Sequence, residues 1–345
     1  MTGSARSPIL GSLLGTAVGD ALGLPYEGMS RERVGKFIGH PLHHRFILGR
    51  GMLSDDTEHT LMLTAALIEN RDDAAGFQRA LGKRLRWWLA GLPAAVGLGT
   101  ARAILCLWMG VPASKSGVLS AGNGAAMRSA ILGVAFRDDA FKRREFSRAA
   151  CHVTHRDLRA EESCRLVTEA AALAAKSLPT SKVLAALEAL LVSEEMRHRF
   201  AQLQTALEEK RPVSAYAEEI GCGLGVSGFA PDTVAVALYA WLRCRGRFDT
   251  AVRSVIECGG DTDTVAAITG GIIGSEVGEA GIPREWIDCL YDYPRSVHYI
   301  RRMARSLEGH ATKAPRVPWP LVLLRNFLFL VLVLGHGLRR LLPPY

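Results

Sequence analysis

Three glycines spaced four residues apart lie inside the first helical pattern of the chain, and they constrain the fold more than any other feature. Apolar residues recur at helical spacing over residues 9–22, which predicts an amphipathic helix, and Gly11, Gly15 and Gly19 fall on one stripe of it. Each glycine costs a helix about 1 kcal/mol relative to alanine. We therefore expect a second backbone to approach this stripe closely, so that the helix belongs to the core of the fold.

The N-terminal segment and the cysteines bear on the compartment of the protein. Arg6 followed by an apolar run is similar to the start of a signal peptide, but Asp20 interrupts that run, so we interpret the segment as a core helix. The seven cysteines are odd in number and form no Cys-x-x-Cys pair, which indicates neither a disulfide framework nor a zinc knuckle. We therefore expect reduced thiols and a cytoplasmic protein.

Helical periodicity recurs along most of the chain, and sustained alternation of apolar and polar residues is nearly absent. The sequence therefore predicts an all-α fold, with long glycine-rich connections at 91–99 and 110–124. A boundary at Lys313-Ala314-Pro315 separates a catalytic domain over 1–312 from a basic, hydrophobic tail over 313–345. After the first helix, the expected helices cover roughly 55–68, 74–90, 100–109, 125–136, 140–152, 160–176, 180–192, 197–209, 232–244, 249–257, 264–278 and 296–307.

The net charge of +8 is not spread over the protein. Residues 295–345 hold nine Lys and Arg side chains and one acid, Glu308, whereas the other 294 residues hold 33 basic and 33 acidic side chains. The body of the protein is therefore neutral and offers no broad positive surface for phosphates. We expect no nucleic-acid partner.

Two short acidic clusters, about two hundred residues apart, have the same format. Ser54-Asp55-Asp56-Thr57 and Asp261-Thr262-Asp263-Thr264 each precede an expected helix, the first of which would begin at Asp55 or Asp56. Asp55 with Glu58 three residues later fits a capping box. Either cluster alone is most simply explained as a set of N-caps.

Taken together, the two clusters predict a binuclear metal site. Aspartates gathered in one pocket repel one another unless cations offset their charge or their pKa values rise. Carboxylate and hydroxyl oxygens are ligands that Mg²⁺ or Mn²⁺ prefers. An EF-hand does not explain the second cluster, because Ala266 and Ile272 stand where that loop needs Gly and Glu.

Five short motifs follow one another along the chain. They are residues 15–23 (GTAVGDALG) with Tyr26-Glu27, residues 54–57 (SDDT), residues 122–128 (GNGAAMR), residues 152–155 (HVTH) and residues 259–264 (GGDTDT). Their order and spacing resemble the ADP-ribosylglycohydrolase family over roughly residues 8–308. One such motif is weak evidence, but five in register are highly specific. The resemblance implies an orthogonal helical bundle with a binuclear metal cleft.

The resemblance also assigns roles to individual residues. Glu27 matches a mobile glutamate that serves as general acid or base, and Asp56 is a catalytic residue as well as a metal ligand. Gly122-Asn123-Gly124 matches a loop that wraps the diphosphate and distal ribose of the substrate, and His155 matches a position in the same pocket. The implied ligands of two Mg²⁺ or Mn²⁺ ions are Ser54, Asp55, Asp56, Asp261, Asp263 and Thr264.

The function implied by the resemblance is hydrolysis of the glycosidic bond between ADP-ribose and a protein side chain or small acceptor. Many relatives carry an acid where this chain has Gly97-Leu98-Gly99-Thr100, so the chain departs there from the family pattern and lacks an accessory acid. The sequence leaves arginine, serine and other acceptor linkages open. Two alternatives also stay open, a metal-dependent nucleotide phosphohydrolase and a non-catalytic, crystallin-like binding protein.

The tail has a composition of its own. Residues 321–334 are almost wholly apolar, interrupted only by Arg325 and Asn326, and Arg339-Arg340 follow them. A helix over 319–338 would be about 30 Å long, close to the thickness of a bilayer core. We expect residues 319–345 to contact a membrane surface. The alternative, a helix buried against the domain or in a homodimer, remains equally open.

Overall fold

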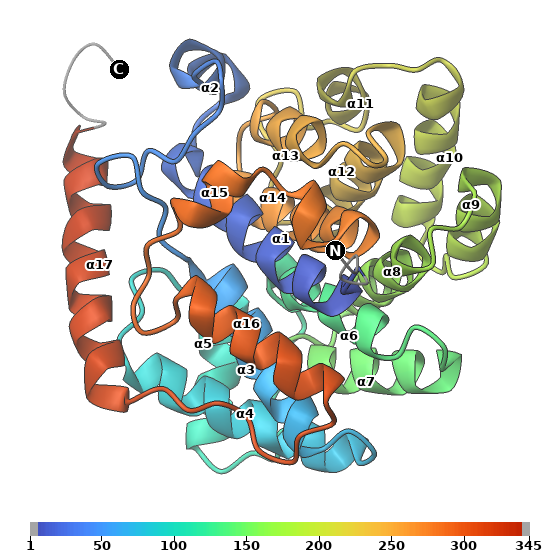
Figure 1. Ribbon diagram of the computed structural model, residues 1–345. Helices are drawn as coiled ribbons and strands as arrows, with labels where there is room; N and C mark the ends of the chain where they lie inside the picture. The colour runs from blue at the N-terminus through green and yellow to red at the C-terminus, as the bar shows by residue number, and fades with distance from the viewer. Residues whose placement is uncertain (1–5, 340–345) are drawn as a thin grey trace, which may run out of the picture.

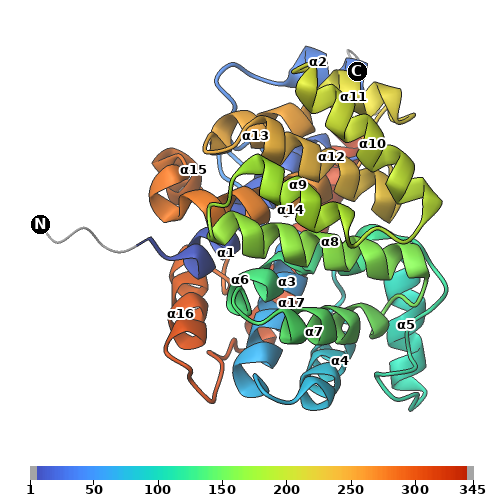
Figure 2. The ribbon, with the colours of Figure 1, turned by 90° about the vertical axis from the view of Figure 1, so that its right-hand side faces the viewer.

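The computed structural model describes residues 6–339, and it is built from helices with no β-sheet in that range (Figures 1 and 2). The predicted all-α fold is confirmed. Three 3-10 turns join the α-helices: η1 (Leu24–Tyr26), η2 (Asn123–Arg128) and η3 (Glu279–Gly281). The α-helices are α1 (Pro8–Gly23), α2 (Arg31–Phe37), α3 (Asp55–Glu69), α4 (Ala74–Ala90), α5 (Leu98–Trp108), α6 (Ala130–Ala135), α7 (Ala140–His152), α8 (Leu158–Ala175), α9 (Thr180–Glu188), α10 (Glu194–Glu208), α11 (Val213–Glu219), α12 (Ala230–Arg243), α13 (Phe248–Ile256), α14 (Thr262–Val277), α15 (Arg284–Asp288), α16 (Val297–Glu308) and α17 (Trp319–Arg339).

Helices α1 and α14 pack against each other along their small residues at the centre of the fold. A Cβ at Gly15 would lie 2.1 Å from the carbonyl oxygen of Gly270, so a side chain there would collide with the facing backbone. At the other end of the contact, a Cβ at Gly23 would lie 2.4 Å from the carbonyl oxygen of Thr262. The expected close approach is therefore confirmed. The two helices run antiparallel, which brings the last turn of α1 beside the first turn of α14.

Most predicted helices agree with the structure to within a few residues, but one prediction is wrong. The helix expected over 125–136 is a 3-10 turn, η2, followed by the short helix α6. In an α-helix the carbonyl of Gly124 would accept the backbone N–H of Arg128, whereas here it accepts the guanidinium of Arg128 at 2.8 Å. The helix expected over 180–192 ends at Glu188, and the short helices α2, α11 and α15 were not predicted.

Helix α17 lies at one edge of the molecule, on the side opposite α8, α9 and α10 (Figure 1). Its inward face is buried at Val322, Arg325, Asn326 and Phe329, which follow helical spacing. Phe329 packs with Leu24, Phe46 and Met52 in a small apolar cluster beside the main core. The described part of the tail therefore contacts the domain along one face.

Two of the described helical stretches are long and apolar enough to cross a membrane by length and composition. Pro8–Tyr26 is 94% buried and forms the centre of the domain, whereas Trp319–Leu338 is only 22% buried. All seven cysteines are free thiols.

Candidate active site

Helix α3 begins at the first acidic cluster. The hydroxyl of Ser54 accepts a hydrogen bond from the backbone N–H of Asp56 at 3.3 Å, so Ser54 is the N-cap and the predicted capping box of Asp55 and Glu58 is wrong. Glu58 is instead buried on the far side of this turn, where its carboxylate accepts the indole N–H of Trp88 and pairs with Arg295 at 2.5 Å. The buried cation and indole satisfy Glu58 better than a backbone N–H at the helix start could.

Asp20, in the last turn of α1, holds this helix start in place. Its carboxylate accepts the backbone N–H groups of Ser54 at 2.9 Å and Thr57 at 3.2 Å, together with the hydroxyl of Thr57. These are N–H groups that a helix start leaves without partners inside the helix, and a carboxylate there is also favoured by the helix dipole. Asp20 therefore links α1 to the cluster on α3.

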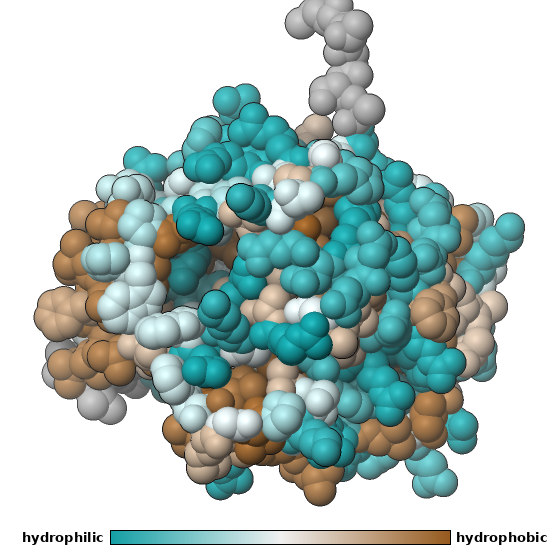
Figure 3. Space-filling view, turned by 90° about the horizontal axis from the view of Figure 1, so that it is seen from below, coloured by the Kyte–Doolittle hydropathy of each residue, from teal (hydrophilic) through white to brown (hydrophobic). Residues whose placement is uncertain are grey.

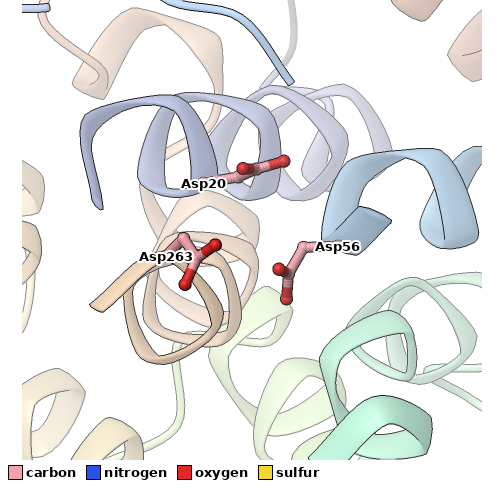
Figure 4. A group of neighbouring side chains, drawn as sticks. All are labelled: Asp20, Asp56 and Asp263. Atoms are coloured by element: carbon pink, nitrogen blue, oxygen red, sulfur yellow. The ribbon is translucent and has the colours of Figure 1, made fainter. Parts of the chain in front are cut away.

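Three buried carboxylates from three helices meet at this point. Asp20 of α1, Asp56 of α3 and Asp263 of α14 each offer an oxygen, and these oxygens lie within 4.8 Å of one another. Figure 4 shows the three side chains directed toward the space between the helix ends. The antiparallel contact of α1 and α14 places Asp20 and Asp263 together, although 243 positions separate them in the sequence.

Most of the other predicted ligands surround Asp56. One carboxylate oxygen of Asp56 accepts the hydroxyl of Ser54 at 3.0 Å and that of Thr264 at 3.3 Å. The charges of Asp55 and Asp261 both raise the pKa of Asp56, which places them within electrostatic reach of it. The structure thus brings four of the six predicted ligands, Ser54, Asp56, Asp263 and Thr264, together around one space, with Asp55 and Asp261 near enough for their charges to act on Asp56. Asp20 is an addition that sequence analysis treated only as an interruption of an apolar helix.

Burial and mutual repulsion make the carboxylates reluctant to ionise together. Burial raises the pKa of Asp20 to about 7, against the lowering effect of its hydrogen bonds from Thr57 and Ser54. Burial first, and the charges of neighbouring carboxylates second, raise the pKa values of Asp55, Asp56 and Asp263 well above the usual range. A divalent cation would remove this repulsion.

The donor set fits such a cation. The second carboxylate oxygen of Asp56 is buried and accepts no hydrogen bond among the described residues, so one acceptor of the cluster is left unused. Carboxylate and hydroxyl oxygens make up the surroundings, which is the chemistry that Mg²⁺ and Mn²⁺ favour. A buried acceptor without a donor is costly unless a ligand completes it.

Glu27 lies at the rim of this space, just after η1 and exposed to solvent. Its charge raises the pKa values of both Asp55 and Asp263, so its carboxylate is close to the two clusters. The loop that carries it is fixed, because the N–H of Gly28 donates to the carbonyl of Gly260 at 2.8 Å and the N–H of Gly260 donates to Met29 at 2.7 Å. The exposed acid is thereby held beside the second cluster.

The predicted substrate loop lies against the same site. The side-chain amide of Asn123 donates to Asp261 at 2.7 Å and to the hydroxyl of Thr233 at 3.0 Å, and its backbone N–H donates to the carbonyl of Gly228 at 3.0 Å. Asn123 therefore connects the loop directly to the second acidic cluster. Gly122 and Gly124 are half-buried.

His155 packs against the two glycines of this loop. A Cβ at Gly122 would lie 3.3 Å from Nε2 of His155, and one at Gly124 would lie 3.3 Å from its Cε1. A Cβ at Gly99, in the stretch where many relatives carry an acid, would lie 3.2 Å from the same Nε2. The imidazole thus lies where the substrate loop and the start of α5 meet.

A buried layer behind the loop was not predicted. The guanidinium of Arg128 donates to Nδ1 of His59 at 3.1 Å, to the carbonyl of Ala150 at 3.0 Å and to the hydroxyl of Thr154 at 2.7 Å. Because that hydroxyl accepts from Arg128, it can donate its own proton to Nδ1 of His155, 2.9 Å away. His155 then keeps its proton on Nε2, facing the glycines. Burial, followed by the charge of Arg128, lowers the pKa of His155 to about 3.

Comparison with known proteins identifies the family. The sequence pattern of the ADP-ribosylglycohydrolases matches residues 1–316. The chain belongs to the ADP-ribosylglycohydrolase family. Helix α17 begins three residues after the matched range, so it lies beyond the part that the family shares.

Individual relatives agree with this assignment. An uncharacterized protein of Archaeoglobus fulgidus is 32% identical over 295 residues, which cover 81% of this chain and 90% of the relative. The ADP-ribosylarginine hydrolase Tri1 of Pseudomonas putida is 27% identical over 81% of this chain and 72% of its own. A solved structure described as an ADP-ribosylglycohydrolase-related protein complex superposes with a TM-score of 0.67 at 26% identity, covering 88% of this chain and 98% of the other.

Proposed function

We propose that this protein hydrolyses the glycosidic bond between the distal ribose of ADP-ribose and an acceptor group, and that two Mg²⁺ or Mn²⁺ ions assist it. One observation carries the proposal. Family motifs that are far apart in sequence bring Asp56 and Asp263 to one buried space, where an oxygen of Asp56 has no hydrogen-bond donor from residues 6–339. The family and its named relative support ADP-ribose as the substrate.

The residues that would hold the two ions are Ser54, Asp55, Asp56, Asp261, Asp263 and Thr264. When bound, the ions would supply positive charge that orients the ribose hydroxyls and activates a water molecule. Asp20 keeps the first cluster in register through its hydrogen bonds to Ser54 and Thr57. Asn123 does the same for Asp261 and carries the backbone amides of the loop proposed to bind the diphosphate.

Glu27 is proposed to move the proton. Water attacks C1 of the distal ribose, the bond from C1 to the acceptor atom breaks, and the acceptor leaves with a proton. Glu27 is exposed to solvent close to the buried carboxylates, where its own carboxylate could accept the proton of the water and return it to the leaving group. The products are free ADP-ribose and the unmodified acceptor.

The test is a product assay on defined substrates. Peptides carrying ADP-ribose on arginine, serine or an acidic side chain are incubated with the protein and Mg²⁺ or Mn²⁺, and the products are separated by chromatography. We expect free ADP-ribose from at least one linkage, with loss of the activity in Glu27→Gln and full activity in the matched control Glu285→Gln, an exposed glutamate on α15. Calorimetric titration with Mn²⁺ measures metal binding without reference to activity.

Other products would overturn the proposal. Inorganic phosphate or AMP would identify a nucleotide phosphohydrolase. Binding of ADP-ribose with no product from any linkage, in a protein that binds Mn²⁺, would identify a binding protein of the crystallin-like kind. Arginine-linked peptides are the most informative arm, because the Pseudomonas relative is named for that linkage while this chain has no acid over residues 97–100.

A further inference from the structure

Helix α17 buries its two central polar residues, Arg325 and Asn326, against the protein and leaves most of its apolar residues exposed, unlike an ordinary surface helix. Arg325 and Asn326 are 5% and 1% exposed, while Leu324, Phe327, Leu328, Val331, Leu334 and Leu338 are 52–65% exposed. In Figure 3 brown side chains gather at the left edge of the view, the side on which α17 lies in Figure 1. Contiguous exposure of this kind marks an interaction surface.

The inward polar groups are all satisfied by the domain, so the helix is docked in this orientation. Arg325 pairs with Asp292 at 2.5 Å and with Glu58 at 3.2 Å. The amide of Asn326 donates to the carbonyl of Gly91 at 2.7 Å, and an imidazole nitrogen of His336 is 2.5 Å from the carbonyl of Phe46. Turning the apolar face inward would break these contacts and expose buried acids. The outward apolar face is therefore a fixed property of the fold.

Aromatic side chains extend this surface onto α4 and α5. Trp87 makes edge contacts with Trp319 at a centroid distance of 6.3 Å and with Trp108 at 5.9 Å. The three indoles are 42–50% exposed. Partly exposed tryptophans beside an apolar face are typical of proteins that sit at the boundary between headgroups and acyl chains.

The charged residues around this apolar surface are mainly basic, which favours an anionic partner. From Gly309 to Tyr345 the chain contains no Asp or Glu, and Lys313 and Arg316 are exposed just before α17. A cavity of about 530 Å³ opens beside the start of α17, lined among others by Trp87, Trp319, Lys83 and Arg316. Neither Lys83 nor Arg316 forms an ion pair within residues 6–339. An apolar face bordered by cations is complementary to an anionic lipid surface.

We propose that α17, with Trp87 and Trp108, docks this protein on anionic membranes, with the helix lying in the plane of the interface. The buried Arg325 keeps the other face of α17 on the domain, so the helix contacts lipid on one side only and does not span the bilayer. A second copy of the chain fits less well, because a dimer through α17 would bring the exposed cations Lys313 and Arg316 of the two copies toward one another with no Asp or Glu in residues 309–345 to offset them. The proposal is independent of the hydrolase activity.

The test is flotation of the full chain with vesicles of phosphatidylcholine, with and without phosphatidylglycerol. We expect co-flotation only with the anionic vesicles, and at least about tenfold weaker binding in Phe327→Glu/Val331→Glu, which places two charges on the outward face. The control Phe141→Glu/Leu224→Glu changes two apolar residues elsewhere that are even more exposed, and it should bind as the parent does. Circular dichroism checks that all variants are folded.

A second pair of variants tests the charge. Lys313→Glu/Arg316→Glu should weaken binding to anionic vesicles about tenfold or more, because each cation near such a surface contributes about 1 kcal/mol. Lys182→Glu/Arg197→Glu, with the same change in net charge but placed on α9 and α10, should not.

Three outcomes would overturn the proposal. Absence of binding to anionic vesicles at low salt would exclude the lipid surface. A dimer in light scattering that Phe327→Glu/Val331→Glu dissociates, without vesicle binding, would assign the surface to a second copy. Retention on vesicles after alkaline carbonate washing would indicate a spanning helix in place of an in-plane one.

Discussion

The guanidinium of Arg325 and the carboxylate of Glu58 lie 3.2 Å apart, and both side chains are almost completely buried. Glu58 is two residues beyond Asp56 on α3, whereas Arg325 belongs to a helix outside the range that the family shares. Arg325 also donates to the carbonyl of Leu53, the residue before the first acidic cluster. The C-terminal helix therefore contacts the residue directly before the first acidic cluster and the helix that follows it.

Removing this cation should be costly. We expect Arg325→Leu to lower the free energy of unfolding by about 3 kcal/mol, because Asp292 and Glu58 would remain buried with less compensation. Urea denaturation measures the loss. Arg302→Leu, which removes an exposed arginine of α16, should change stability by less than about 0.5 kcal/mol. Equal losses in the two variants would show that the buried pairs do not stabilise the fold.

The contact of α1 with α14 should tolerate no side chain at its centre. In Gly270→Ala the new methyl group would lie 2.1 Å from the carbonyl oxygen of Gly15, and we expect a loss of about 3 kcal/mol or failure to fold. Gly35 of α2 is a matched control, because a Cβ there meets nothing within 4 Å. Gly35→Ala should be neutral or stabilise by up to about 1 kcal/mol. Thermal unfolding of both variants compares the two sites, and a neutral Gly270→Ala would contradict the close approach.

Features that depend only on residues close together in the sequence could be predicted from it. The stripe of Gly11, Gly15 and Gly19 lies within one short segment of the sequence. It predicts the close approach of a second backbone, whichever helix provides that backbone. The two acidic clusters are visible because each is contiguous and precedes a helix. Their shared format predicted that they meet at one site, the family resemblance implied the same, and the structure brings Asp56 and Asp263 together.

Residues whose roles depend on distant partners were not predictable. Asp20 looks like an interruption in an apolar helix until α14 places it beside Asp263. The expected helix over 125–136 does not form as one α-helix. Arg128, at the end of η2, donates hydrogen bonds to His59 and Thr154, which come from other segments. The partner of Arg325 on α3 lies 267 positions away, and no local period carries that information.

The buried His155 predicts a specific dependence of stability on pH. In the unfolded chain its imidazole takes up a proton below about pH 6.5, whereas in the fold it does so only near pH 3. The unfolded state binds more protons between these values, so His155 favours unfolding as the pH falls through that window. Relative to His155→Gln, the parent protein should lose about 2 kcal/mol of stability between pH 6.5 and about pH 5.

Denaturation curves of both proteins at several pH values measure this difference, and comparison with the variant removes the contribution of the carboxylates, which titrate in both. A constant difference across the window would mean that His155 is accessible to protons in the fold. Above about pH 7 the two curves should run parallel, because the imidazole is then neutral in both the folded and the unfolded chain.

Two buried aspartates should respond in opposite ways to the same change. Asp56 faces carboxylates, so in chelator-treated protein Asp56→Asn relieves repulsion and should raise the free energy of unfolding by about 1–2 kcal/mol. Asp292 pairs with Arg325 at 2.5 Å, so Asp292→Asn leaves a buried guanidinium with less compensation. We expect this variant to lower the free energy of unfolding by a similar amount or more.

Added Mn²⁺ should stabilise the parent and not Asp56→Asn, and turnover in that variant should fall more than about a hundredfold. Thermal shift with and without Mn²⁺ provides the readout. Asp56→Asn that destabilises the chelated protein and keeps its response to Mn²⁺ would contradict the assignment of Asp56 as a metal ligand.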